Sequence, residues 1–124
     1  MAQLDLDQNN AKYQIRGYQP GLMQINEQML TQSLIITPNQ LIENWPPQTI
    51  EELTAEHLKM ITDLKPDILL IGTGSKHVLL KTDIYGELVN QGIGVEVMST
   101  AAACRTFNAL ASEDRKVAAA LIIK

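Results

Sequence analysis

The chain has 124 residues, of which 45% are hydrophobic, and its charged side chains give a net charge of −4. This length and apolar content favour one folded domain over residues 1–124 and exclude a disordered chain. The acidic balance argues against binding to nucleic acid or to an anionic membrane surface, because both need clustered cations. No apolar run approaches the ~20 residues that span a bilayer, so the sequence predicts no membrane insertion.

Residues 1–11 are predicted to be a flexible lead-in. They are acidic and polar, without the basic and apolar segments of a signal peptide. The single cysteine, Cys104, cannot form an internal disulfide, which is typical of a reducing compartment. Together these features predict a cytoplasmic protein of a prokaryote.

Short strands separated by turn residues follow, as in an antiparallel β-meander over residues 13–45. Tyr13 to Tyr18 alternates polar and apolar side chains, and Pro20-Gly21 marks the first turn. Trp45, before two prolines, is interpreted as a core residue rather than a docking anchor. The four expected strands are 13–18, 22–25, 29–37 and 40–45.

The pattern then changes to helices and buried strands. Thr49 or Thr54 can begin a helix that Lys65-Pro66 ends. Residues 67–123 read as strand–helix–strand–helix–strand, which favours parallel neighbours, with the direction of the last strand left open. The sequence therefore predicts an α/β fold, a single three-layer domain with a partly parallel sheet. Its expected elements are strand 68–72, helix 82–91, strand 93–98, helix 100–112 and strand 117–123.

Two of these strands end in polar loops. Gly72, Thr73, Gly74, Ser75 and Lys76 follow the first, and their backbone amides and hydroxyls could face an anion. The motif has neither the third glycine of a dinucleotide fingerprint nor the spacing of a P-loop. A tight turn at the strand exit is the alternative interpretation.

The second loop begins with Ser99 and Thr100, and Thr100 is the expected N-cap of the following helix. If the two strands are parallel neighbours, both loops emerge at one edge of the sheet. Arg105 and Asn108 share one face of that helix, close to the same edge. Thus the sequence predicts a cleft between residues 72–76 and 98–108.

Glu96 interrupts an apolar strand, so it either reaches solvent or pairs with Arg105 or Lys76. No second carboxylate and no nucleophile–base pair accompanies it, so no catalytic residue is predicted. The histidines and Cys104 lack the spacing of metal ligands, and no metal or cofactor is predicted. The candidate ligand-binding residues are Gly72, Thr73, Gly74, Ser75, Lys76, Glu96, Ser99, Thr100, Arg105 and Asn108.

The segments 67–74 and 92–110 carry a further signal. They include Gly-Val-Glu-Val-Met at 94–98 and Ala-Cys-Arg-Thr-Phe-Asn at 103–108, and they resemble a family of small domains of unknown function. That family includes an adipogenesis-associated domain protein and a mitochondrial complex I assembly factor. The resemblance extends from about Gly17 through Trp45, and it implies a three-layer α/β domain with an added meander. This sequence differs from some members of the family at Ser99, where they carry Asp, and near Lys81, where they have a longer loop.

The resemblance also implies a function through partners rather than turnover, and it offers no catalytic residues to transfer. The leading hypothesis is a non-catalytic binding or assembly-accessory protein with a protein partner, similar to a complex I assembly factor. The alternative is a small-molecule or anion-binding site, enzymatic in its strongest form, at residues 72–76 and 98–108. A homo-oligomer that uses the meander as its interface is a third hypothesis.

Overall fold

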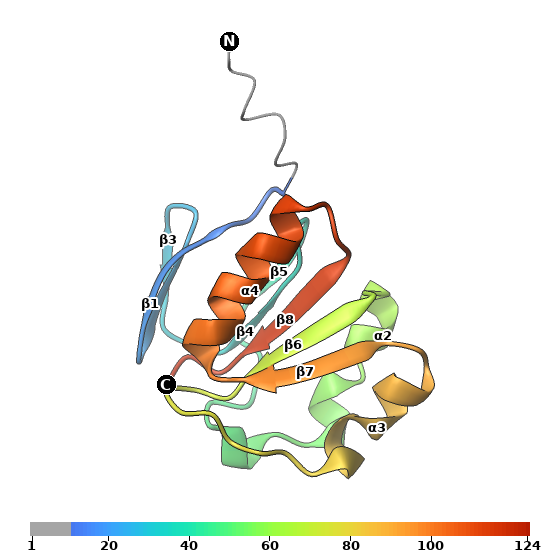
Figure 1. The fold of residues 1–124 in the computed structure, drawn as a ribbon. Coiled ribbons are helices and arrows are strands. Elements are labelled where there is room, and N and C mark those ends of the chain that lie inside the picture. The colour runs from blue at the N-terminus through green and yellow to red at the C-terminus, as the bar shows by residue number, and fades with distance from the viewer. Residues whose placement is uncertain (1–10) are drawn as a thin grey trace.

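The computed structural model describes residues 11–124, which form two β-sheets and the helices around them (Figure 1). The smaller sheet is antiparallel in the order β1-β2-β3, and the larger has the order β5-β4-β8-β6-β7. Most of the predicted lead-in, residues 1–10, lies outside the described residues. The strands are β1 (Ile15–Gln19), β2 (Leu22–Ile25), β3 (Gln28–Leu30), β4 (Leu34–Ile36), β5 (Leu41–Ile42), β6 (Ile68–Gly72), β7 (Gly94–Met98) and β8 (Val117–Leu121).

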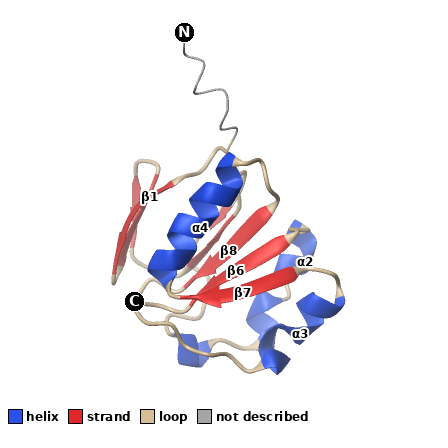
Figure 2. Cartoon of the chain, viewed as in Figure 1, coloured by secondary structure: helices blue, strands red, loops and turns tan. Residues whose placement is uncertain are grey.

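Two crossovers build the three layers of the fold. Helix α3 (Thr82–Asn90) connects β6 to β7, and helix α4 (Thr100–Ser112) carries the chain back from β7 past β6 to β8. Because the connections run in opposite directions along the sheet, right-handed crossovers require the helices to cover opposite faces. Figure 2 shows α4 on one face and α3 with α2 (Ile61–Leu64) on the other. The predicted three-layer α/β class is confirmed.

The last strand, β8, lies in the middle of the larger sheet. It pairs parallel with β6 and antiparallel with β4, which settles the direction that the sequence left open. Every residue of β8 is buried, and three of the five are alanines. Small side chains on both faces of a central strand let the covering layers pack close to it.

Two expected elements were wrong in detail. The strand predicted at 29–37 is two strands in different sheets, β3 and β4, separated by exposed residues at Thr31 and Gln32. All three residues of β4 are buried, so they suit the larger sheet, which is covered on both faces, whereas Met29 in β3 is 55% exposed. The strand predicted at 40–45 is paired only at β5.

The helix predicted from Thr49 is also interrupted. Residues 50–52 and 55–58 are 3-10 helices, and only α2 is α-helical. Leu53 and Thr54 are extended, and the Thr54 backbone N–H bonds to the His57 ring, which starts a new turn there. Leu53, Leu58 and Ile61 of this segment are buried against the sheet.

The hydrophobic core has two clusters, one on each face of the larger sheet. One joins α4 to both sheets through Ile15, Met23 and Phe107 among others. The other contains Trp45, which is 1% exposed and donates its indole N–H to the His57 carbonyl at 3.0 Å. The interpretation of Trp45 as a core residue is confirmed.

Candidate functional site

The two loops singled out in the sequence meet in space. β6 and β7 pair in parallel from Ile68↔Gly94 to Gly72↔Met98, so their loops leave the same edge of the sheet. The Thr73 N–H donates to the Met98 carbonyl at 2.9 Å, and the Thr100 N–H donates to the Gly74 carbonyl at 2.9 Å. One loop turns toward α3 and the other toward α4, which is the arrangement that forms ligand crevices in open α/β sheets.

Thr100 joins the ends of three strands. Its side chain has no exposed surface, and its hydroxyl accepts a hydrogen bond from the Gly74 N–H at 2.8 Å. The same hydroxyl donates to the Ile122 carbonyl at 2.6 Å, just beyond β8. Thr100 was the expected N-cap, and this was wrong: Ser99 is the N-cap, and its Oγ accepts from the Ala102 N–H at 3.3 Å.

Glycine is required at two positions here. A Cβ on Gly72 would lie 2.8 Å from the Thr100 hydroxyl and 2.9 Å from Leu121, so any side chain would separate β6 from α4. Gly74 has φ of +106°, and a Cβ there would lie 2.9 Å from the Lys124 carbonyl. The glycines therefore permit close packing of the strand ends, and the Thr73 and Gly74 amides already bond within the protein.

The rest of the first loop is a surface turn. The Thr73 hydroxyl bonds to the Lys76 carbonyl and accepts from the Val78 N–H at 3.2 Å, which closes the turn. Ser75 and Lys76 are exposed on it. Beside the turn lies a shallow cavity of about 250 Å³, whose lining includes Ser75, Lys76, Lys124 and Glu51. Within the 72–76 loop, Ser75 and Lys76 are thus the residues that are open to solvent.

Arg105 and Asn108 lie elsewhere, in a groove of about 320 Å³ between α4 and β1. Asn108 holds β1, since its Oδ1 accepts from the Ile15 N–H at 3.1 Å and its Nδ2 donates to the Ile15 carbonyl at 2.7 Å. Arg105 is exposed on the rim of this groove. Lys76 and Arg105 thus line different cavities.

Glu96 reaches solvent from β7, the outermost strand of the larger sheet. Among residues 11–124, the ion pair that forms joins Lys59 to Glu56 at 3.0 Å, so Glu96 pairs with neither Arg105 nor Lys76. Of the two alternatives predicted for Glu96, exposure to solvent is therefore the correct one.

The groove beside β1 also contains two buried polar atoms. Burial raises the pKa of the Cys104 thiol to about 12, and the nearby Arg105 opposes this shift only in part. Burial, and then Cys104, raise the pKa of Tyr18, whose hydroxyl has no hydrogen-bond partner among the described residues. A thiol held neutral is a weak nucleophile. Cys104 packs in the core cluster together with Phe107.

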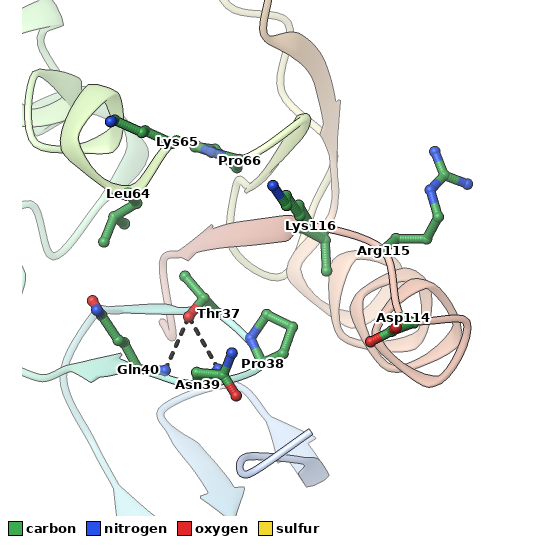
Figure 3. A pocket seen from close by; sticks show the side chains of 11 residues that line it. Thr37, Pro38, Asn39, Gln40, Leu64, Lys65, Pro66, Asp114, Arg115 and Lys116 are labelled. Atoms are coloured by element: carbon green, nitrogen blue, oxygen red, sulfur yellow. Dashed lines mark hydrogen bonds between the residues drawn. The ribbon is translucent and has the colours of Figure 1, made fainter. Parts of the chain in front are cut away.

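A further cavity, of about 450 Å³, lies at the other end of β6 and β8 (Figure 3). Its walls are three turns, at 37–40, 64–66 and 114–117. Thr37 closes the first turn by accepting from the Asn39 and Gln40 amides. The sequence predicted that a helix ends at Lys65-Pro66, but the hollow depends on how the three turns pack together, which no local signal predicts.

Within residues 11–124, no helix is both long and apolar enough to cross a bilayer. In the same part of the chain, His, Cys, Asp and Glu side chains do not gather in a group that could hold a metal ion.

Comparison with known proteins shows that the chain matches a protein family. Residues 15–122 match the model of a protein family described as "Protein of unknown function (DUF498/DUF598)". The solution structure of a protein from Xanthomonas campestris is 39% identical, with a TM-score of 0.81 over 90% of this chain and 85% of that one.

Two of the similar proteins bear on function through their names. NADH dehydrogenase (ubiquinone) 1 alpha subcomplex assembly factor 3 from Danio rerio is 34% identical over 110 residues, 87% of this chain. The chain spans only 63% of that protein's length. The 13 kDa major membrane protein of Francisella tularensis is 33% identical over 90 residues, which is 72% of this chain and 73% of that protein.

Proposed function

Because the chain belongs to this family of proteins of unknown function, we propose that it is a non-catalytic accessory protein that assists the assembly of a membrane NADH dehydrogenase. The observation that carries the proposal is the 34% identity to an assembly factor over 87% of the chain. The match extends over most of the domain, so it involves the whole fold and not a single motif.

The geometry of the sheet edge supports a binding role over catalysis. The polar groups of Thr73, Gly74 and Thr100 already bond within the protein. Thr73 bonds to the Met98 carbonyl, and Thr100 bonds to Gly74 and to the Ile122 carbonyl, so these bonds connect the ends of β6, β7 and β8. A rigid edge of this kind is suited to present a surface to a partner. The thiol nearest this edge, Cys104, is held in its neutral form.

We further propose that the protein works in the cytoplasm of a prokaryote and reaches the membrane through its partner. The name of the Francisella relative, a major membrane protein, fits a domain that is recovered with membranes. This part of the proposal predicts that washing membranes with high salt releases the protein without detergent.

The test is deletion of the gene in its own host. We expect less fully assembled NADH dehydrogenase on native gels of the membranes, and slower NADH oxidation at unchanged succinate oxidation. A plasmid copy of the gene should restore both. Normal NADH dehydrogenase content in the deletion strain would contradict the proposal.

The alternative, an anion-binding site, is favoured by one observation. Lys76 and Lys124 both line the cavity of about 250 Å³ beside the exposed turn. Glu51 lines the same cavity and opposes them, which reduces the attraction for an anion. The assembly role therefore remains the preferred function.

A further inference from the structure

The edge strands of the two sheets differ in how much unpaired backbone they offer to another chain. An exposed sheet edge presents unpaired N–H and C=O groups that can pair with another chain. β5 is two residues long and β3 is three, so each offers little to a partner. The outer edge of β1 is held by Asn108, which bonds both backbone groups of Ile15. β7 is five residues long and ends the larger sheet.

The hydrogen-bond pattern shows which groups of β7 face outward. The Gly94 N–H donates to the Asp67 carbonyl at 3.0 Å, and the Met98 carbonyl accepts from Thr73 at 2.9 Å. In a parallel pair, alternate residues bond to the same neighbour, so Gly94, Glu96 and Met98 bond to β6. Val95 and Val97 therefore point their N–H and C=O groups away from the sheet.

These outward groups are open in the part of the chain that the structure describes. No hydrogen bond within residues 11–124 uses the backbone of Val95 or Val97 on that side. Helix α3 packs against β7 and the two valine side chains belong to the core on that face, so the strand is held firmly while its edge stays free. Figure 2 shows β7 as the rim of the sheet.

We propose that the outer edge of β7 takes up an extended segment of a partner protein as a sixth strand, with a Lys or Arg of that segment beside Glu96. The partner is the one that the proposed function requires, so this inference rests on that function. Pairing to an edge strand is a common way to bind peptides, in which backbone bonds give affinity and side chains give specificity. Glu96 is exposed at the centre of the strand and forms no ion pair with any of residues 11–124.

Glu96 also argues against a second copy of this chain as the occupant. Two copies related by a two-fold axis can use all four outward groups of Val95 and Val97 only if the axis passes beside Glu96. That arrangement places the two Glu96 carboxylates directly opposite each other, and like charges in opposed positions destabilise a strand pair. The same carboxylate favours a cation from a different chain.

A peptide titration tests the binding directly. The probe is a synthetic seven-residue peptide of alternating threonine and valine with lysine at its centre, and its twin has glutamate there. We expect the lysine peptide to shift the NMR signals of the Val95 and Val97 amides, and to bind about fivefold more tightly than its twin. Equal affinity of the two peptides, or shifts elsewhere only, would overturn the proposal.

Two variants locate the contact. Val97→Pro removes an outward N–H and leaves the bonds to β6 intact, so it should abolish the shifts. Glu96→Lys changes an exposed side chain, should not affect folding, and should reverse the preference between the peptides. Glu27→Lys, the same charge change at an exposed position in the turn between β2 and β3, is the matched control and should alter neither. Shifts by the lysine peptide that persist in Val97→Pro, or an unchanged preference between the peptides in Glu96→Lys, would contradict the inference.

The same variants separate this inference from the proposed function. In the deletion strain, Glu96→Lys should fail to restore NADH dehydrogenase, whereas Glu27→Lys should succeed. If the deletion lowers the enzyme and Glu96→Lys restores it fully, the function stands and the β7 inference is wrong. If the deletion has no effect but the lysine peptide binds β7, the edge site stands and the assembly role is wrong.

Discussion

Thr100 shows how much of the fold can depend on one hydroxyl. It connects the Gly74 N–H and the Ile122 carbonyl in a region with no exposed surface. Thr100→Val keeps the shape but leaves both groups without that partner. We expect the free energy of unfolding to fall by about 1–3 kcal/mol, measured as a lower midpoint in urea at an unchanged slope.

Two further variants control that measurement. Thr100→Ser keeps the hydroxyl and should lose less stability than Thr100→Val. Thr31→Val makes the same change at an exposed position and should have little effect. If Thr100→Val were as stable as the wild type, the hydroxyl would not be the link between the strand ends that the geometry indicates.

At the scale of elements, the helices and strands were predicted most accurately where a single local pattern determines them. Helix α4 was predicted over its observed range, because the polar residues Ser99 and Thr100 mark where it begins. The approach of the loops after β6 and β7 followed from parallel pairing alone. The roles of Asn108 and Arg105 could not be predicted, because they depend on where β1 packs, 93 residues away along the chain in the case of Asn108.

The break between β3 and β4 has a similar explanation. Residues 29–37 have strand-like composition throughout, and only the burial of Leu34 to Ile36 by two covering layers assigns them to the larger sheet. The helix predicted to start at Thr49 or Thr54 is broken at Leu53, which is extended, and a 3-10 turn begins after Thr54. Between β3 and β4, tertiary packing rather than local preference decided where the element ended. At Thr54, the local bond from its N–H to the His57 ring began a new turn.

Asn108 attaches β1 to α4, which gives a prediction about one element. Asn108→Ala removes both hydrogen bonds to Ile15, so the amides of β1 should exchange with solvent faster. Amides in β6 and β8 should change much less, as measured by hydrogen exchange. Ser112→Ala on the same helix removes only a local bond to Ala109 and should leave β1 protected. Equal exchange in β1 for both variants would contradict the proposed attachment.

At the scale of the molecule, the two sheets share one core cluster. Ile15 and Met23 of the smaller sheet lie in it with Phe107 of α4 and Leu70 of the larger sheet. Trp45 is the single tryptophan, and it lies in the other cluster, on the opposite face of the larger sheet. Its fluorescence therefore reports on a part of the protein distant from Met23.

Met23→Ala should destabilise the whole domain and not the smaller sheet alone. We expect a loss of about 2–5 kcal/mol, because Met23 has no exposed surface. The midpoint in urea should fall equally by Trp45 fluorescence and by circular dichroism, as for one cooperative unit. Met29→Ala, in the same sheet but at a side chain that is 55% exposed, should shift neither midpoint appreciably. A fall seen by circular dichroism with an unchanged Trp45 transition would mean that the smaller sheet unfolds on its own.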